Sequence, residues 1–138
     1  MSINPSTAFA LSILLVEDHE DTRGILRRLM ERWGFRITSA KSVGEARAAL
    51  DREEFDVILC DIGLPDGNGT EVAEYLRTKS SIPALAMSGY GTETDKARTR
   101  AAGFSRHIVK PILAEDLLQL LRVYDAESPA RKAHESLA

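Results

Sequence analysis

Short apolar runs alternate with amphipathic stretches along most of the chain. The runs are bounded by charged or turn-forming residues, a pattern typical of strands buried on both faces of a parallel sheet. Strands are predicted in this way at residues 13–16, 35–40, 57–60, 83–87 and 107–109.

The segments between these runs show the spacing of helices. One helix is predicted from about residue 20 to a stop at Gly34, and a second behind the cap Ser42, with Glu45 completing a capping box. Three more are predicted at residues 69–79, 92–102 and 113–124. The predicted inward face of the first is Ile25, Leu26, Leu29, Met30 and Trp33, and that of the weak fourth helix is Ala97, Ala101 and Ala102.

This alternation of strands and helices predicts an α/β fold. Parallel strands joined by helical crossovers form one sheet with helices on both faces, and the crossovers are right-handed. We expect one domain over residues 12–124, between a flexible leader at 1–11 and a polar tail at 125–138. With five units, the most economical strand order is 2-1-3-4-5, although the number of units alone does not fix it.

Composition narrows the possible functions. The chain has 138 residues, 43% of them hydrophobic and 28% charged, with a net charge of −3. This charge balance argues against a nucleic-acid or membrane surface, and no segment resembles a membrane span or a signal peptide. The single cysteine, Cys60, is expected in the core. We therefore expect a cytoplasmic protein.

Charged residues follow three of the predicted strands. Glu17 and Asp18 follow the first, Asp61 the third, and Lys110 the last. The carboxyl ends of parallel strands meet at one edge of the sheet, where such folds place their sites. Clustered carboxylates repel one another, and Mg2+ relieves that repulsion. Gly63 is a candidate for a backbone carbonyl ligand, because a residue without a side chain lets the backbone come close.

Two further groups complete the candidate site. Ser88 ends the fourth predicted strand and offers a hydroxyl, and Lys110 offers a fixed positive charge. A metal, an ammonium and a hydroxyl around one carboxylate equip a site for phosphoryl transfer. Asp61 is then the nucleophile, and the product is an aspartyl phosphate.

These motifs resemble the receiver domain of two-component response regulators. The matching segments are LVED at 15–18, DIGLPDGNG at 61–69, SG at 88–89 and VKP at 109–111. The resemblance implies the flavodoxin-like doubly wound fold with strand order 2-1-3-4-5. The segments 88–93 and 102–111 look most like receivers attached to hybrid histidine kinases.

The resemblance also implies roles and partners. Asp61 would take phosphate from a sensor histidine kinase or a histidine phosphotransfer protein, in two-component or phosphorelay signalling. Asp18 and Asp61 would bind Mg2+ directly and Glu17 through water, while Lys110 would contact the phosphate and Ser88 would swing toward it. The chain would be no enzyme beyond assisting its own phosphorylation and dephosphorylation. The peptide bond before Pro111 is a candidate for the cis form.

Signalling is expected through protein contacts or a homodimer. The usual surface in the family is formed by the fourth helix, fifth strand and fifth helix, and the candidates on it are Arg98, Arg100, Arg106, Leu118 and Arg122. His107 stands where family members commonly carry a tyrosine or phenylalanine switch. Gly63 and Tyr90 occupy positions that, in the family, tune the lifetime of the phosphate.

Other functions fit the sequence less well. A flavodoxin-like or dinucleotide-binding protein needs a phosphate cradle after the first strand, where this chain has acidic residues. A haloacid-type phosphatase normally carries a second acid where Gly63 stands. The remaining alternative is a receiver-like interaction scaffold that acts without phosphorylation.

Overall fold

The computed structural model describes residues 11–89 and 91–127. Tyr90 therefore lies outside the described residues, as do the expected leader up to residue 10 and the tail from residue 128. Within the described residues, no helix is both long and apolar enough to span a bilayer.

A five-stranded parallel sheet forms the centre of the molecule. Its strands are β1 (Ser12–Val16), β2 (Arg36–Ala40), β3 (Val57–Asp61), β6 (Ala84–Ser88) and β7 (Arg106–Val109). Their order across the sheet is β2-β1-β3-β6-β7, which is the predicted order 2-1-3-4-5. Two short antiparallel strands, β4 (Gly63–Leu64) and β5 (Gly67–Asn68), form within the glycine-rich loop and were not predicted.

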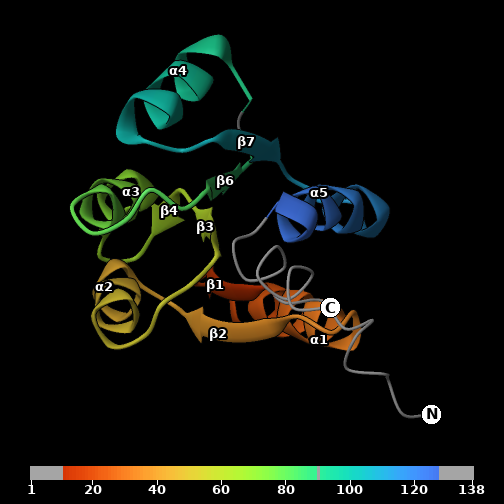
Figure 1. Ribbon diagram of the computed structural model, residues 1–138. Coiled ribbons are helices and arrows are strands. Elements are labelled where there is room, and N and C mark those ends of the chain that lie inside the picture. Colours follow the sequence, from red (N-terminus) through yellow and green to blue (C-terminus); the bar gives the residue numbers. More distant parts are fainter. Residues whose placement is uncertain (1–10, 90, 128–138) are drawn as a thin grey trace.

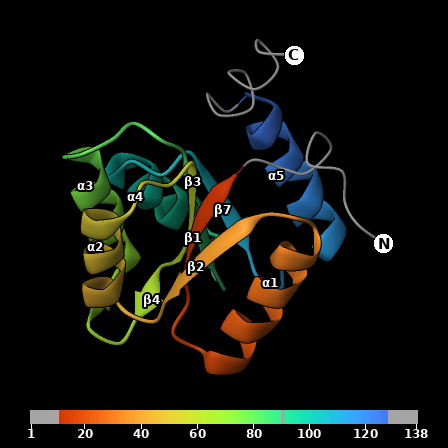
Figure 2. The same cartoon turned by 60° about the horizontal axis from the view of Figure 1, so that its bottom comes forward.

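Helices cover both faces of this sheet (Figures 1 and 2). They are α1 (Glu20–Arg32), α2 (Val43–Arg52), α3 (Gly69–Arg77), α4 (Glu93–Ala102) and α5 (Ala114–Glu127). Helices α1 and α5 lie on one face, and α2, α3 and α4 on the other. Helix α5 reaches Glu127, the last described residue, and so extends beyond the predicted end near residue 124.

Alternation along the strands builds a separate core on each face. In β1, Leu14 and Val16 belong to the core under α2 and α3, whereas Ile13 and Leu15 belong to the core under α1 and α5. All four side chains are fully buried, as expected for an interior strand of a parallel sheet. The fully buried Cys60 confirms the core role predicted for it, and burial raises the pKa of its thiol.

The inward faces of two helices differ from the prediction. Ile25 is 58% exposed, because α1 is centred on the sheet through Leu26 and Met30, one turn apart. In α4 the buried residues are Thr99 and Ala102, whereas Ala97 and Ala101 are exposed.

This rotation of α4 brings a hydroxyl rather than a methyl group against the sheet. The Thr99 hydroxyl lies 3.0 Å from the Lys96 carbonyl of α4 and 3.2 Å from Nδ1 of His107 on β7, and these hydrogen bonds offset the cost of burying it. Apolar periodicity was therefore wrong for Ala97 and Ala101 and missed Thr99, whereas Ala102 is buried as predicted.

The predicted cap of α2 is partly confirmed. The Ser42 hydroxyl accepts a hydrogen bond from the backbone of Glu45 at 3.0 Å. The Glu45 carboxylate accepts from the backbone of Lys41 instead of closing the box on Ser42. A second carboxylate, that of Asp66, accepts hydrogen bonds from the backbone of Val43 at 2.8 Å and Gly44 at 3.0 Å. The loop after β3 is thereby fastened to the first turn of α2.

Candidate functional site

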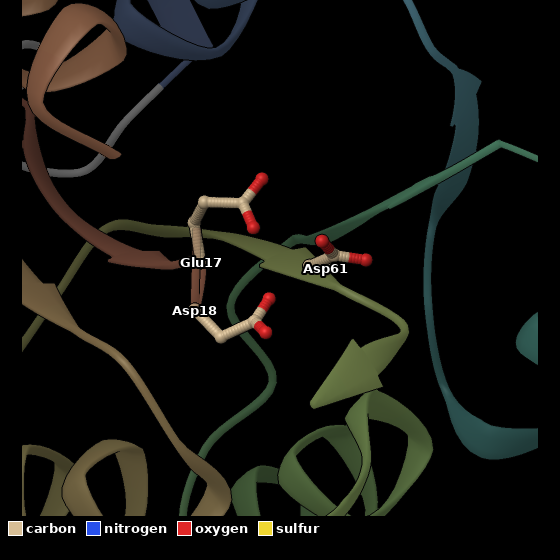
Figure 3. A group of neighbouring side chains, drawn as sticks. All are labelled: Glu17, Asp18 and Asp61. Atoms are coloured by element: carbon tan, nitrogen blue, oxygen red, sulfur yellow. The ribbon is translucent and has the colours of Figure 1, made fainter. Parts of the chain in front are cut away.

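The register of β1 and β3 brings the acidic residues together. Val16 pairs with Cys60, so the next residues, Glu17 and Asp61, come level at the carboxyl edge of the sheet. Asp18 follows directly, and one carboxylate oxygen from each of the three acids lies within 4.8 Å of the others. Figure 3 shows these side chains gathered around the ends of the two strands. Glu17 is fully buried, Asp61 is 8% exposed and Asp18 is exposed.

Lys110 joins this cluster from the end of β7. Its ammonium nitrogen donates to Oδ2 of Asp61 at 2.7 Å and to Oε1 of Glu17 at 2.8 Å. The position of Lys110 follows from strand register, since Ser88 pairs with Val109 and the Lys110 amide donates to the Ser88 carbonyl at 2.7 Å. The peptide bond between Lys110 and Pro111 is cis, which confirms that prediction.

Burial and charge act against each other at these groups. Burial raises the pKa of Glu17, the Lys110 ammonium opposes this rise, and the neighbouring Asp61 adds to it. For Lys110, burial alone lowers the pKa, but the bonds to Asp61 and Glu17 outweigh burial and raise it. The lysine therefore stays protonated and compensates two carboxylates at once.

Backbone groups hold the acidic side chains in place. The amide of Gly63 donates to Oδ1 of Asp61 at 3.1 Å, and the amide of His19 donates to Oε2 of Glu17 at 3.2 Å. The guanidinium of Arg23 donates to the backbone carbonyls of Glu17 at 3.0 Å and Asp18 at 3.2 Å. Sequence analysis missed Arg23, because no motif marks a side chain that binds carbonyls five and six positions back.

Two glycines near Asp61 differ in the space around them. A Cβ on Gly63 would meet no protein atom within 4 Å, and its role as a carbonyl ligand stays a prediction. A Cβ on Gly69 would lie 2.3 Å from the carbonyl oxygen of Asp61, closer than real Cβ contacts. The start of α3 is therefore pressed directly against the backbone of Asp61, and the Gly69 amide donates to the Ile62 carbonyl at 2.7 Å.

Ser88 is 7% exposed and does not stand alone. Its hydroxyl lies 2.8 Å from Nε2 of the half-buried His107, and Nδ1 of the same ring lies 3.2 Å from the hydroxyl of Thr99. Thr99 was not among the predicted site residues. The sequence offered one indication: the predicted helix at 92–102 has few apolar residues, so a polar residue such as Thr99 could be expected on its buried face.

The predicted signalling surface is largely exposed. Arg98, Arg100, Arg106 and Arg122 are exposed on α4, β7 and α5. Leu118 is half-buried and packs against the core under α1 and α5, so less of it is available for contact.

The chemistry of this edge suits a small, hard cation. Carboxylate and carbonyl oxygens are the ligands of Mg2+, which keeps several waters and needs few protein ligands. Glu17, Asp18 and Asp61 supply such oxygens within one space. No dinucleotide cradle replaces them, since two acids occupy the turn that follows β1.

Comparisons with known proteins agree with this geometry. The family model of the response regulator receiver domain matches residues 13–122. The sensory transduction protein RegX3 of Mycobacterium tuberculosis is 33% identical over 111 residues, which are 80% of this chain and 49% of RegX3. An uncharacterised 14.6 kDa protein of Leptolyngbya boryana is 31% identical over 121 residues, 86% of this chain and 92% of that protein.

A solved structure shows the same arrangement. The non-phosphorylated HemR receiver domain from Leptospira biflexa superposes with a TM-score of 0.77 at 29% identity, over 85% of this chain and 95% of that chain. The chain spans about half the length of RegX3 and of the Escherichia coli regulator KdpE. The finer likeness to receivers of hybrid histidine kinases stays a prediction.

Proposed function

Because the chain belongs to the response regulator receiver domain family of two-component signalling, we propose that it accepts a phosphoryl group on Asp61. One observation carries the proposal: the Asp61 carboxylate lies both in the three-acid cluster and 2.7 Å from the Lys110 ammonium. A nucleophile beside a cation and a metal-binding cluster matches the charge that develops in phosphoryl transfer.

The transfer forms one bond and breaks another. A carboxylate oxygen of Asp61 attacks phosphorus while the P–N bond of a phosphohistidine on the partner breaks. The bonding pair returns to the partner's imidazole, which takes up a proton from solvent. A sensor histidine kinase or a histidine phosphotransfer protein supplies that phosphohistidine. The chain assists the reaction and the later hydrolysis, without being an enzyme in any wider sense.

The acidic cluster is the proposed Mg2+ site. Asp18, Asp61 and the Gly63 carbonyl would bind the ion directly, and Glu17 would act through water. When bound, the ion supplies positive charge against the oxygens of the phosphoryl group. The donor set supports this assignment, since its carboxylate oxygens lie within 4.8 Å of one another.

Lys110 and Ser88 complete the proposed site. Lys110 already contacts Asp61 and needs only a small shift to contact a phosphoryl oxygen attached there. Ser88, at the end of the neighbouring strand, would turn its hydroxyl toward the same group. Tyr90 and Gly63 are proposed to tune how long the phosphate survives.

The output of the chain is proposed to be protein contact through α4, β7 and α5. The four exposed arginines on this surface, Arg98, Arg100, Arg106 and Arg122, suit an acidic partner or a second copy of the chain in a homodimer.

The test is incubation with acetyl phosphate and Mg2+, followed by intact mass. The native chain should gain one phosphoryl group, and Asp61→Asn should gain none. Asp66→Asn is the matched control, because Asp66 lies in the same loop but caps α2 instead of joining the cluster. Equal labelling of the native chain and Asp61→Asn would rule out Asp61. A native chain that stays unlabelled would favour a scaffold that acts without phosphate.

A further inference from the structure

A chain of hydrogen bonds leads from the phosphoryl site into α4. The Ser88 hydroxyl lies 2.8 Å from Nε2 of His107. Nδ1 of His107 lies 3.2 Å from the Thr99 hydroxyl, and Thr99 donates its proton to the carbonyl of Lys96 at 3.0 Å. Three side chains from β6, β7 and α4 are thus connected end to end.

The direction of the other two bonds depends on where the single proton of the Thr99 hydroxyl lies. A threonine hydroxyl has one proton, and the Lys96 carbonyl can only accept. When that proton lies toward the Lys96 carbonyl, Thr99 accepts from His107, which places a hydrogen on Nδ1 of the ring. A neutral imidazole carries a hydrogen on one nitrogen only, so Nε2 presents a lone pair and Ser88 donates to it.

We propose that the Thr99 proton lies toward the Lys96 carbonyl, and that Thr99 and His107 are positioning residues that control where the Ser88 proton points. While the ring is neutral, the Ser88 hydroxyl donates to Nε2 of His107 and presents lone pairs elsewhere. Phosphoryl oxygens are acceptors, so Ser88 must break this bond before it can donate to them. A second proton on the ring reverses the bond, since Nε2–H then donates to Ser88, whose own proton can turn to the phosphoryl group. This inference rests on the proposed function of Asp61.

Charged residues from α4, β7 and α5 line the same groove as His107. Lys96 and Arg100 come from α4, Arg106 from β7 itself, and Asp116 from α5, and all four line one groove with Thr99 and His107. From β6 the ring meets the Ser88 hydroxyl. Salt screens such surface charges, so pH must be varied at constant ionic strength.

This arrangement depends on an imidazole. A phenylalanine ring at position 107 has neither a lone pair for Ser88 nor a hydrogen for Thr99. The direction of the Ser88 proton in this chain therefore depends on whether the His107 ring is protonated. A phenylalanine at position 107 would remove that dependence. Imidazole is the side chain that ordinarily changes charge between about pH 5 and 8.

The first experiment measures the ring directly, without phosphorylation. Long-range proton–nitrogen correlation spectra distinguish the two neutral tautomers, and the His107 signals are assigned by their loss in His107→Phe. We expect the Nδ1–H form in the native chain and in Thr99→Ser, which keeps the hydroxyl. Thr99→Val keeps the shape but removes the acceptor, and should shift the ring toward Nε2–H. A native ring in the Nε2–H form would overturn the proposal.

The second experiment measures phosphorylation by acetyl phosphate and Mg2+ across pH. The ratio of the variant rate to the native rate at each pH cancels the ionisation of the donor. Thr99→Val should react roughly fivefold faster where the ring is neutral, the scale of one net hydrogen bond. Its ratio should approach one at acidic pH, and Thr99→Ser should stay near one throughout.

Equal ratios for Thr99→Val and Thr99→Ser at every pH would overturn the proposal. Failure of all three proteins to take up phosphate would instead refute the proposed function of Asp61. The tautomer measurement still decides the hydrogen-bond direction in that case, so the two failures are distinguishable.

Discussion

The ammonium nitrogen of Lys110 lies 2.7 Å from Oδ2 of Asp61, although 49 positions separate the two residues in the sequence. The same nitrogen lies 2.8 Å from the buried Glu17. One cation therefore compensates two carboxylates, and its removal leaves both of them near a third, on Asp18.

Replacing Lys110 by glutamine should destabilise the chain when Mg2+ is absent. The expected loss is about 2 kcal/mol, since one partner is partly exposed and fully buried pairs lose more. Mg2+ should reduce the difference in stability between the native chain and Lys110→Gln, because the ion neutralises the same carboxylates. Urea unfolding with EDTA and with Mg2+ measures both effects. Lys41→Gln is the control, since its pair with Glu45 is exposed and spans 4.0 Å. Equal losses for the two variants would contradict the prediction.

Glu17 should make stability fall as pH rises above its ordinary pKa of 4.5. Burial raises the pKa of this carboxyl in the folded chain, so between the unfolded and folded values the folded state binds more protons. Stability must then decrease with rising pH across that interval. Glu17→Gln lacks the ionisation and should show a smaller decrease in urea unfolding from pH 4 to 7 in EDTA. If the free energy of unfolding changes with pH in the same way for the native chain and Glu17→Gln, the raised pKa of Glu17 is contradicted.

Gly69→Ala should weaken both the fold and the site. The new Cβ would lie 2.3 Å from the Asp61 carbonyl oxygen, which forces the backbone to move. The expected destabilisation is about 2 kcal/mol, as for other overpacked sites, with weaker Mg2+ binding by calorimetry. Gly44→Ala is the control, because its Cβ would meet Asp66 at an ordinary 3.5 Å. Unchanged Mg2+ affinity in Gly69→Ala would show that the contact does not position Asp61.

The fluorescence of Trp33 should change little when Mg2+ binds. Trp33 caps the end of α1 remote from the acidic cluster, and the 13-residue helix is about 20 Å long. Thermal stabilisation in the same titration would verify that the ion binds. A large intensity change at saturation would mean that the site and the far edge of the sheet are coupled.

Sequence reasoning located the site because its residues sit at strand ends. Strand register then places these residues side by side: because Val16 pairs with Cys60, the next residues, Glu17 and Asp61, come level. The same logic places Lys110 one residue beyond the pair of Ser88 and Val109. Chain order alone does not give strand order, which came from the resemblance to receivers.

The parts that were missed depend on side-chain partners distant in sequence. Thr99 faces the sheet because His107 offers it a hydrogen bond, and apolar periodicity contains no trace of that partner. Likewise, the sequence around Asp66 does not indicate that its carboxylate binds the backbone of Gly44, 22 positions earlier in the first turn of α2. The hairpin of β4 and β5 is too short to leave a periodic signal.

The shallow seating of α4, with Thr99 and Ala102 as its buried residues, bears on how such a domain diversifies. Most residues of this helix can be substituted in evolution without disturbing either core. The exposed residues of α4 can therefore change, and with them any partner that this helix contacts, while the acidic cluster of Glu17, Asp18 and Asp61 stays the same.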